Sequence, residues 1–146
     1  MSDSTLVDDA TNYSLTGPAD PDTVAEFRKH LSRWIKDTVS INAQQVADVV
    51  LASHEALSNC AEHAYCNHGS ASGGLMTLNI RNDRAQETVQ VSVSDQGCWI
   101  EPSRAANTAD RGRGLTLMHG LADDCTVQRG TGGTTVCLHF HRCASR

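Results

Sequence analysis

The order in which hydrophobic periodicities follow one another constrains the fold of this chain more than any other sequence feature. Two long segments with helical spacing come first, and two pairs of alternating segments follow, with a short helical segment between the pairs. The helical segments are 20–38, 42–65 and 115–121, and the alternating ones are 76–80, 89–93, 125–129 and 134–140. We therefore predict an α+β fold, a two-layer α/β sandwich with the helices on one face of a mostly antiparallel mixed sheet.

Local signals mark the ends of several elements. Asp20 is a candidate N-cap and Pro21 stands at the first helical position, which favours a helix start there. The second helix covers roughly 42–65, and His68-Gly69-Ser70 ends it. Tyr13-Ser14-Leu15 predicts a short edge strand that stops before Gly17-Pro18.

The composition is that of one ordinary globular domain. The chain has 146 residues, of which 39% are hydrophobic and 20% charged, so we expect a flexible N-terminus over 1–12 and a single domain over 13–146. The net charge of -5 and the scattered Lys and Arg residues disfavour nucleic acid as a partner. The N-terminal residues lack the basic and apolar parts of a signal peptide, and no run is long enough to span a bilayer, so we expect no membrane contact and a cytoplasmic location.

Six cysteines lie at uneven spacings in a chain large enough to fold without bridges, so we expect reduced thiols. A structural zinc site is a weaker alternative, because the spacing fits familiar ligand patterns poorly. The candidate ligands are Cys60, His63, Cys66 and His68 near the second helix, and His139, His141 and Cys143 near the C-terminus.

Glu55 and Asn59 are four residues apart on the second predicted helix, so both project from the same side of it. By themselves they are also compatible with an ordinary solvated helix face. A functional interpretation therefore depends on what the rest of the chain brings near them.

Asp95 ends the core-facing row of an alternating segment, because it shares parity with Val89, Val91 and Val93. A carboxylate in that position needs a donor, either from the protein or from a ligand. Gly97 allows close approach of the backbone, which favours a ligand. The alternative is a simple turn in which Asp95 caps its own backbone.

A glycine-rich segment, Arg111-Gly112-Arg113-Gly114-Leu115, leads from a long polar loop over 101–113 into the short third helix. Free backbone N–H groups and the positive end of a helix at that point favour phosphate binding, and the loop is a lid candidate. The same residues are also typical of an ordinary loop.

Thr134 shares parity with Val136, Leu138 and Phe140, so its hydroxyl is expected to face the interior at the start of the last long strand. There it could reach the same pocket as Asp95. The alternative is that Gly133-Thr134 only ends a hairpin turn.

In this order, the segments resemble the motifs of the GHKL ATPase superfamily with the Bergerat fold, and most closely those of the bacterial anti-sigma factor serine-protein kinases. The resemblance spans most of the chain. The stretch from Glu55 to Tyr65 is similar to the N-box, Asp95-Gln96-Gly97 to the adenine motif, 111–115 to the glycine-rich lid motif and Gly133-Thr134 to the last-strand motif. Trp99 departs from the pattern, because many relatives have a second glycine at that position.

The resemblance implies a role for each matched residue. Asn59 would hold Mg²⁺ against the phosphates of ATP, and Glu55 would act as general base. Asp95 would accept a hydrogen bond from the adenine amino group, supported by Thr134. The full set that the resemblance implies for nucleotide binding is Asn59, His63, Asp95, Gly97, Arg111, Gly112, Arg113, Gly114, Leu115 and Thr134.

The resemblance also implies an activity and partners. The chain would sequester a sigma factor and would phosphorylate a serine of a small anti-anti-sigma protein of the STAS type, with homodimerisation left open. An ATP-binding regulatory module without phosphotransfer is the main alternative, and a structural zinc-binding protein is a weaker one.

Overall fold

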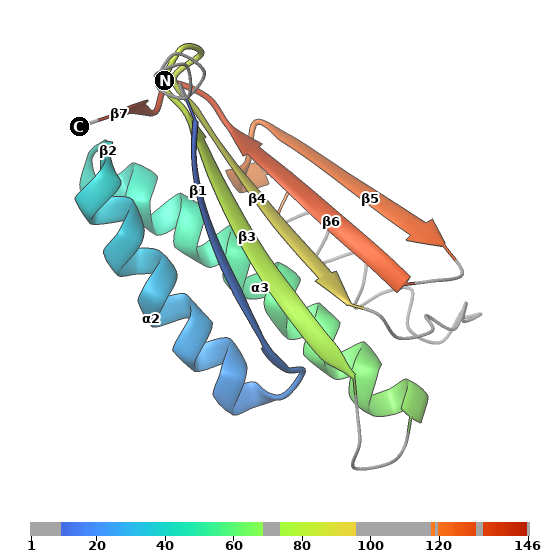
Figure 1. Cartoon of the computed structure of the whole chain (residues 1–146). Helices are drawn as coiled ribbons and strands as arrows, with labels where there is room; N and C mark the ends of the chain where they lie inside the picture. Colours follow the sequence, from blue (N-terminus) through green and yellow to red (C-terminus); the bar gives the residue numbers. More distant parts are fainter. Residues whose placement is uncertain (1–9, 69–73, 96–117, 119, 131–132, 146) are drawn as a thin grey trace, which may run out of the picture.

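A computed structural model of the chain describes residues 10–68, 74–95, 118, 120–130 and 133–145, without the side chains of residues 10, 63–68 and 129–130. Two long helices cover one face of a five-stranded sheet (Figure 1), which confirms the predicted α+β class and its two layers. The elements are β1 (Ala10–Pro18), α2 (Pro21–Thr38), β2 (Val39–Ser40), α3 (Ala43–His68), β3 (Leu75–Asp83), β4 (Thr88–Asp95), β5 (Asp124–Gly130), β6 (Gly133–Phe140) and β7 (Ala144–Ser145).

The large sheet has the strand order β1-β3-β4-β6-β5, and each of its four pairings is antiparallel. β3 and β4 form one hairpin and β5 and β6 form the other, as the alternating segments predict. Between the hairpins, Met118, Gly120 and Leu121 are helical, within the predicted third helix.

Both long helices begin at capped ends. In α2 the backbone N–H of Thr23 donates to Asp20 Oδ1 at 2.8 Å, and Pro21 follows the cap, as predicted. In α3 the predicted start at Asn42 is a capping box, because Gln45 N donates to Asn42 Oδ1 at 2.7 Å and Asn42 N donates to Gln45 Oε1 at 3.0 Å. These bonds satisfy N–H groups that the first helical turn leaves without intrahelical partners.

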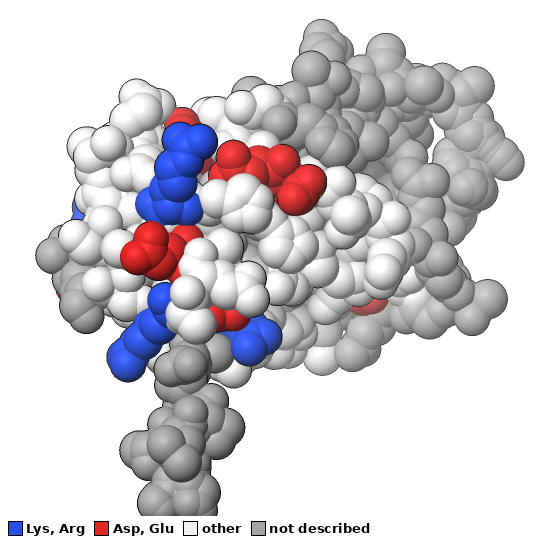
Figure 2. Space-filling view, turned by 90° about the horizontal axis from the view of Figure 1, so that it is seen from above, with Lys and Arg blue, Asp and Glu red and all other residues white. Residues whose placement is uncertain are grey.

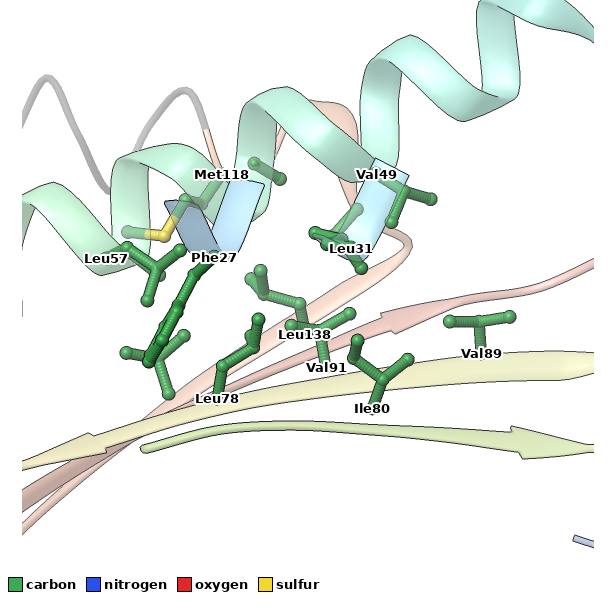
Figure 3. Close-up of a cluster of buried hydrophobic side chains, with 14 of the residues drawn as sticks. Phe27, Leu31, Val49, Leu57, Leu78, Ile80, Val89, Val91, Met118 and Leu138 are labelled. Carbon is green, nitrogen blue, oxygen red and sulfur yellow. The ribbon is translucent and has the colours of Figure 1, made fainter. Parts of the chain in front are cut away.

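The core lies between the helices and the sheet, where side chains from both layers interdigitate (Figure 3). Phe27 and Leu31 of α2 meet Leu78 and Ile80 of β3 there, and Met118 of the third helix is fully buried in the same cluster. On β4 every second residue is buried, so one face of the strand points into this core. The apolar periodicities of the sequence are therefore the source of the two-layer arrangement.

Three strand features differ from the sequence prediction. β1 runs over nine residues instead of three and passes through Gly17-Pro18, where Pro18 still pairs with Leu75. A proline is tolerated at the end of an edge strand, where its missing N–H costs no ladder bond. The two-residue strands β2 and β7 pair with each other and were not expected, because two residues show no periodicity.

Charged side chains of both signs lie side by side on the face of the molecule seen in Figure 2. Helix α2 exposes four basic side chains, and the acidic residues Glu26 and Asp37 are exposed on the same helix. The basic residues are Arg28, Lys29, Arg33 and Lys36.

In the described ranges, none of the helices has the length and apolar character needed to cross a bilayer.

Candidate functional site

The site is organised around a pair of polar residues buried in the sheet. Asp95 ends β4 and Thr134 is the second residue of β6, and the two are direct partners across the antiparallel pairing. Asp95 is 8% exposed and Thr134 is 5% exposed, so both side chains are withdrawn from solvent. The sequence prediction that both side chains face the interior agrees with their burial and register.

The hydroxyl oxygen of Thr134 is buried and has no hydrogen-bond partner among the described residues. A buried hydroxyl without a partner is uncommon in folded proteins, because it has lost its bonds to water and gained none in return. The position beside Asp95 therefore suits a ligand or an ordered water that would bond to both groups.

Cys60 connects α3 to this pair. Its thiol donates a hydrogen bond to Asp95 Oδ2 with an Sγ–Oδ2 distance of 3.5 Å, and the Cys60 side chain is 7% exposed. Burial raises the pKa of the Cys60 thiol well above its usual range, and the negative charge of Asp95 and the hydrogen bond to it act in the same direction. The thiol is therefore held in its protonated, donating form.

Glu55 and Asn59 lie one helical turn apart on α3, and both are half-buried. Asn59 directly precedes Cys60, so the contact of Cys60 with Asp95 places Asn59 close to the end of β4. The structure thus brings α3, the end of β4 and the start of β6 together at one end of the molecule. Side chains on all three elements can contribute to a single site.

The chemistry of this set fits a nucleotide and a magnesium ion. A buried carboxylate beside an unpaired hydroxyl can accept the amino hydrogens of an adenine ring. An asparagine carbonyl oxygen is a hard ligand of the kind Mg²⁺ binds, and a carboxylate at Glu55, one turn away, can accept a proton. Ser53 Oγ, His54 Nδ1 and Asn82 Oδ1 also lack a hydrogen-bond partner among the described residues, but Thr134 is the one that lies opposite Asp95.

Several predicted site residues lie outside the part of the chain that the structure describes. They are the side chain of His63, together with Gly97, Trp99, Arg111, Gly112, Arg113, Gly114 and Leu115. The lid candidate over 101–113 is outside it as well. Their assignment stays a prediction.

The described cysteines, Cys60, Cys125, Cys137 and Cys143, are free thiols, as expected. Within the described ranges, no three His, Cys, Asp or Glu side chains are grouped closely enough to hold a metal ion. The second group of candidate zinc ligands, at 139–143, falls in these ranges, whereas the side chains of His63, Cys66 and His68 do not.

No sequence pattern predicts the contact of the Cys60 thiol with Asp95. Its place on the apolar side of the helix indicates a buried thiol, which is correct. The only sequence signal that Cys60 lies near the site is its position directly after Asn59. That position does not indicate which group on the sheet the thiol contacts. The contact depends on how α3 packs on β4.

Comparison with known proteins places the chain in a family. The profile of the family described as Histidine kinase-like ATPase domain matches residues 17–140, and the chain belongs to this family. The match includes α3, β4 and β6, which carry the described site residues.

Two relatives are similar to the chain over most of its length. The chain is 27% identical over 136 residues to the serine-protein kinase RsbW of Bacillus velezensis, covering 84% of this chain and 81% of the relative. It is also 27% identical over 145 residues to the serine-protein kinase RsbW of Bacillus licheniformis, covering 90% and 87%. Both relatives are serine-protein kinases, and the similarity covers most of the chain.

A solved structure supports the same fold. The crystal structure of the RsbU and RsbW domains of Rv1364c from Mycobacterium tuberculosis superimposes with a TM-score of 0.64 at 26% identity, over 93% of this chain. The match covers 33% of the crystallised chain, which includes both domains.

Proposed function

We propose that this protein is an ATP-dependent protein serine kinase and anti-sigma factor. It would sequester a sigma factor and transfer the γ-phosphate of ATP to a serine of a STAS-type anti-anti-sigma protein in the cytoplasm. The observation that carries the proposal is the buried Asp95–Thr134 pair beside the helix that bears Glu55 and Asn59. Membership of the ATPase family and similarity to serine-protein kinases support it.

Each described residue has a distinct role in this proposal. The Asp95 carboxylate accepts a hydrogen bond from the adenine amino group, and the Thr134 hydroxyl supplies a second contact, directly or through water. Asn59 Oδ1 binds Mg²⁺. The Glu55 carboxylate takes the proton from the serine hydroxyl of the acceptor, which makes that oxygen a better nucleophile. ATP, when bound, supplies the phosphoryl group, and its Mg²⁺ ion neutralises part of the negative charge on that group.

The remaining assignments rest on the resemblance alone. His63, Gly97 and the segment 111–115 would complete the contacts to the nucleotide, with Arg111, Gly112, Arg113, Gly114 and Leu115 near the phosphates. Free N–H groups of a glycine-rich segment ahead of a helix would suit phosphate oxygens.

The test uses two measurements on the full chain. Calorimetry with Mg-ADP, on the wild type and on Asp95→Asn, measures whether adenine binding depends on the carboxylate, and we expect Asp95→Asn to abolish most of the affinity. Transfer of label from ATP to STAS-type proteins encoded in the same genome then measures kinase activity. Pull-down with and without ATP from native lysate identifies whether a sigma factor is retained.

The outcomes separate the candidate functions. Unchanged affinity of Asp95→Asn for ADP would show that the adenine contact is misassigned. Nucleotide binding and sigma-factor capture without any label transfer would instead indicate the regulatory module that binds ATP and performs no chemistry.

A further inference from the structure

The carboxylate of Asp95 is enclosed by three elements. Its backbone pairs with Met76 of β3 on one side and with Thr134 of β6 on the other, and Cys60 of α3 reaches its Oδ2 atom. Since Cys60 and Asp95 are both buried, water competes poorly for this hydrogen bond. The thiol is therefore in contact with the group on which adenine recognition would depend.

A hydrogen bond at this point controls the orientation of the carboxylate. The terminal torsion of an aspartate is broad and roughly two-fold, so rotamer preference alone does not fix the plane of the two oxygens. A donor held at Oδ2 by a packed helix favours one orientation of that plane. An ionised carboxylate accepts at about four sites, and the thiol occupies one of them.

We infer that Cys60 is a positioning residue for nucleotide recognition: its thiol orients the Asp95 carboxylate toward the amino group of an adenine ring. The inference rests on the proposed nucleotide site and adds to it a residue that sets base specificity. The unpaired hydroxyl of Thr134, opposite Asp95, independently indicates that a polar ligand group belongs beside this carboxylate.

The role of donor is separable from the role of core residue by substitution. Cys60→Ser keeps a donor on a side chain of similar length. Cys60→Val fills the buried space without a donor, and Cys60→Ala removes both donor and volume. Cys143→Ala is the matched control, because Cys143 is buried as fully and its thiol contacts the carbonyl oxygen of His141 instead of the site.

The experiment measures the preference for one base over another, as the ratio of two dissociation constants. For each full-length variant, calorimetry gives the Kd for ADP and for the 5′-diphosphate of purine riboside, which lacks the 6-amino group. We expect the wild type and Cys143→Ala to prefer ADP equally. Cys60→Val and Cys60→Ala should lose about threefold to tenfold of that preference, the worth of one modest hydrogen bond. Cys60→Ser should keep it to within about twofold.

Three results would overturn the inference. If the donorless variants bind both nucleotides more weakly but in the wild-type ratio, Cys60 acts only through packing. If the wild type does not bind ADP, the proposed function fails together with this inference, whereas a wild-type preference that no Cys60 variant alters removes the role of Cys60 alone. Thermal unfolding of each variant shows which of them are folded, and Cys60→Val provides a donorless site even if Cys60→Ala does not fold.

Discussion

Asp95 and Thr134 are direct partners across β4 and β6, yet the Thr134 hydroxyl has no hydrogen-bond partner among the described residues. A buried hydroxyl in that state lowers the stability of the folded chain by about 1–3 kcal/mol relative to one that is bonded. Residues that reduce stability in this way are typical of binding sites, where the missing partner arrives with the ligand.

This relationship predicts opposite effects of one substitution on stability and on binding. Thr134→Val keeps the branched shape and removes the unpaired hydroxyl, so the unliganded protein should gain about 1 kcal/mol of unfolding free energy. Its affinity for ADP should fall, because one contact in the pocket is lost. Thr135→Val, on the opposite face of the strand, is the control for both measurements. A loss of both stability and affinity in Thr134→Val would contradict the prediction.

Glu55→Ala and Asn59→Ala should differ in phenotype. A general base acts during the chemical step, so Glu55→Ala should bind Mg-ATP normally while its transfer rate falls by about 10²–10⁴-fold. Asn59→Ala should lose the magnesium dependence of nucleotide binding, because a metal ligand acts in the complex itself. Glu62→Ala, an exposed carboxylate on the same helix, should behave like the wild type. Normal transfer by Glu55→Ala would exclude it as the base.

The stability of the fold should decline at high pH through its buried thiols. Burial raises the pKa of the Cys143 thiol from 9.0 to about 11, and the charge of Asp123 adds to the effect. The folded state thus holds this proton more tightly than the unfolded chain, so the contribution is complete below pH 9 and is lost as the pH rises toward 11. Over that interval the Cys143 thiol lowers the free energy of unfolding by about 1.4 kcal/mol per pH unit.

Cys143→Ala should therefore lose stability less steeply than the wild type when urea denaturation is repeated between pH 8 and 11. A decline should remain, because burial also raises the pKa values of Cys60 and Cys125. Cys137→Ala, which removes a half-buried thiol, serves as the control for the loss of a cysteine side chain. Identical slopes for Cys143→Ala and the wild type would show that the Cys143 thiol does not titrate differently in the two states.

Removal of the α2 cap should destabilise the fold by a defined amount. Asp20→Ala deletes the acceptor of the Thr23 N–H bond, and such caps are worth about 1 kcal/mol. Asp22→Ala, which removes a carboxylate from the same helical turn without removing the cap, should cost only a few tenths of a kcal/mol, roughly the strength of a surface helix-dipole interaction. Equal losses of unfolding free energy in the two variants would show that charge, and not the cap, matters there.

Nucleotide binding should change the fluorescence of Trp99 and leave that of Trp34 unaltered. Trp34 stacks on Tyr13 at a centroid distance of 5.9 Å, and Tyr13 pairs with Ile80, which is four residues from Met76, the partner of Asp95 on β3. Trp99 lies outside the described residues, and its place two residues after the adenine motif leads us to expect it at the mouth of the pocket. Trp99→Phe should abolish the ATP-dependent change, and Trp34→Phe should preserve it. A silent titration of Trp34→Phe, with binding confirmed by calorimetry, would place Trp99 elsewhere.

The sequence predicts the elements of this fold well because their signals are local. The cap at Asp20 and the alternation along β4 each depend on neighbouring residues, and both are as expected. The inward orientation of Asp95 and Thr134 follows from parity for the same reason. The bond between Cys60 and Asp95 joins residues 35 positions apart and depends on the packing of a helix on a strand, so no local pattern indicates it.

The pairing of β1 with β3 has a consequence for how the chain folds. The hairpins β3–β4 and β5–β6 join strands that are near neighbours in sequence. In contrast, α2 and α3 separate β1 from its partner β3 along the chain. Closing so long a loop costs conformational entropy, and contacts with the core offset that cost only once the core has formed. We expect the hairpins and helices to assemble early and the nine-residue edge strand to add last. In pulsed hydrogen exchange the amides of β1 would then gain protection after those of β4.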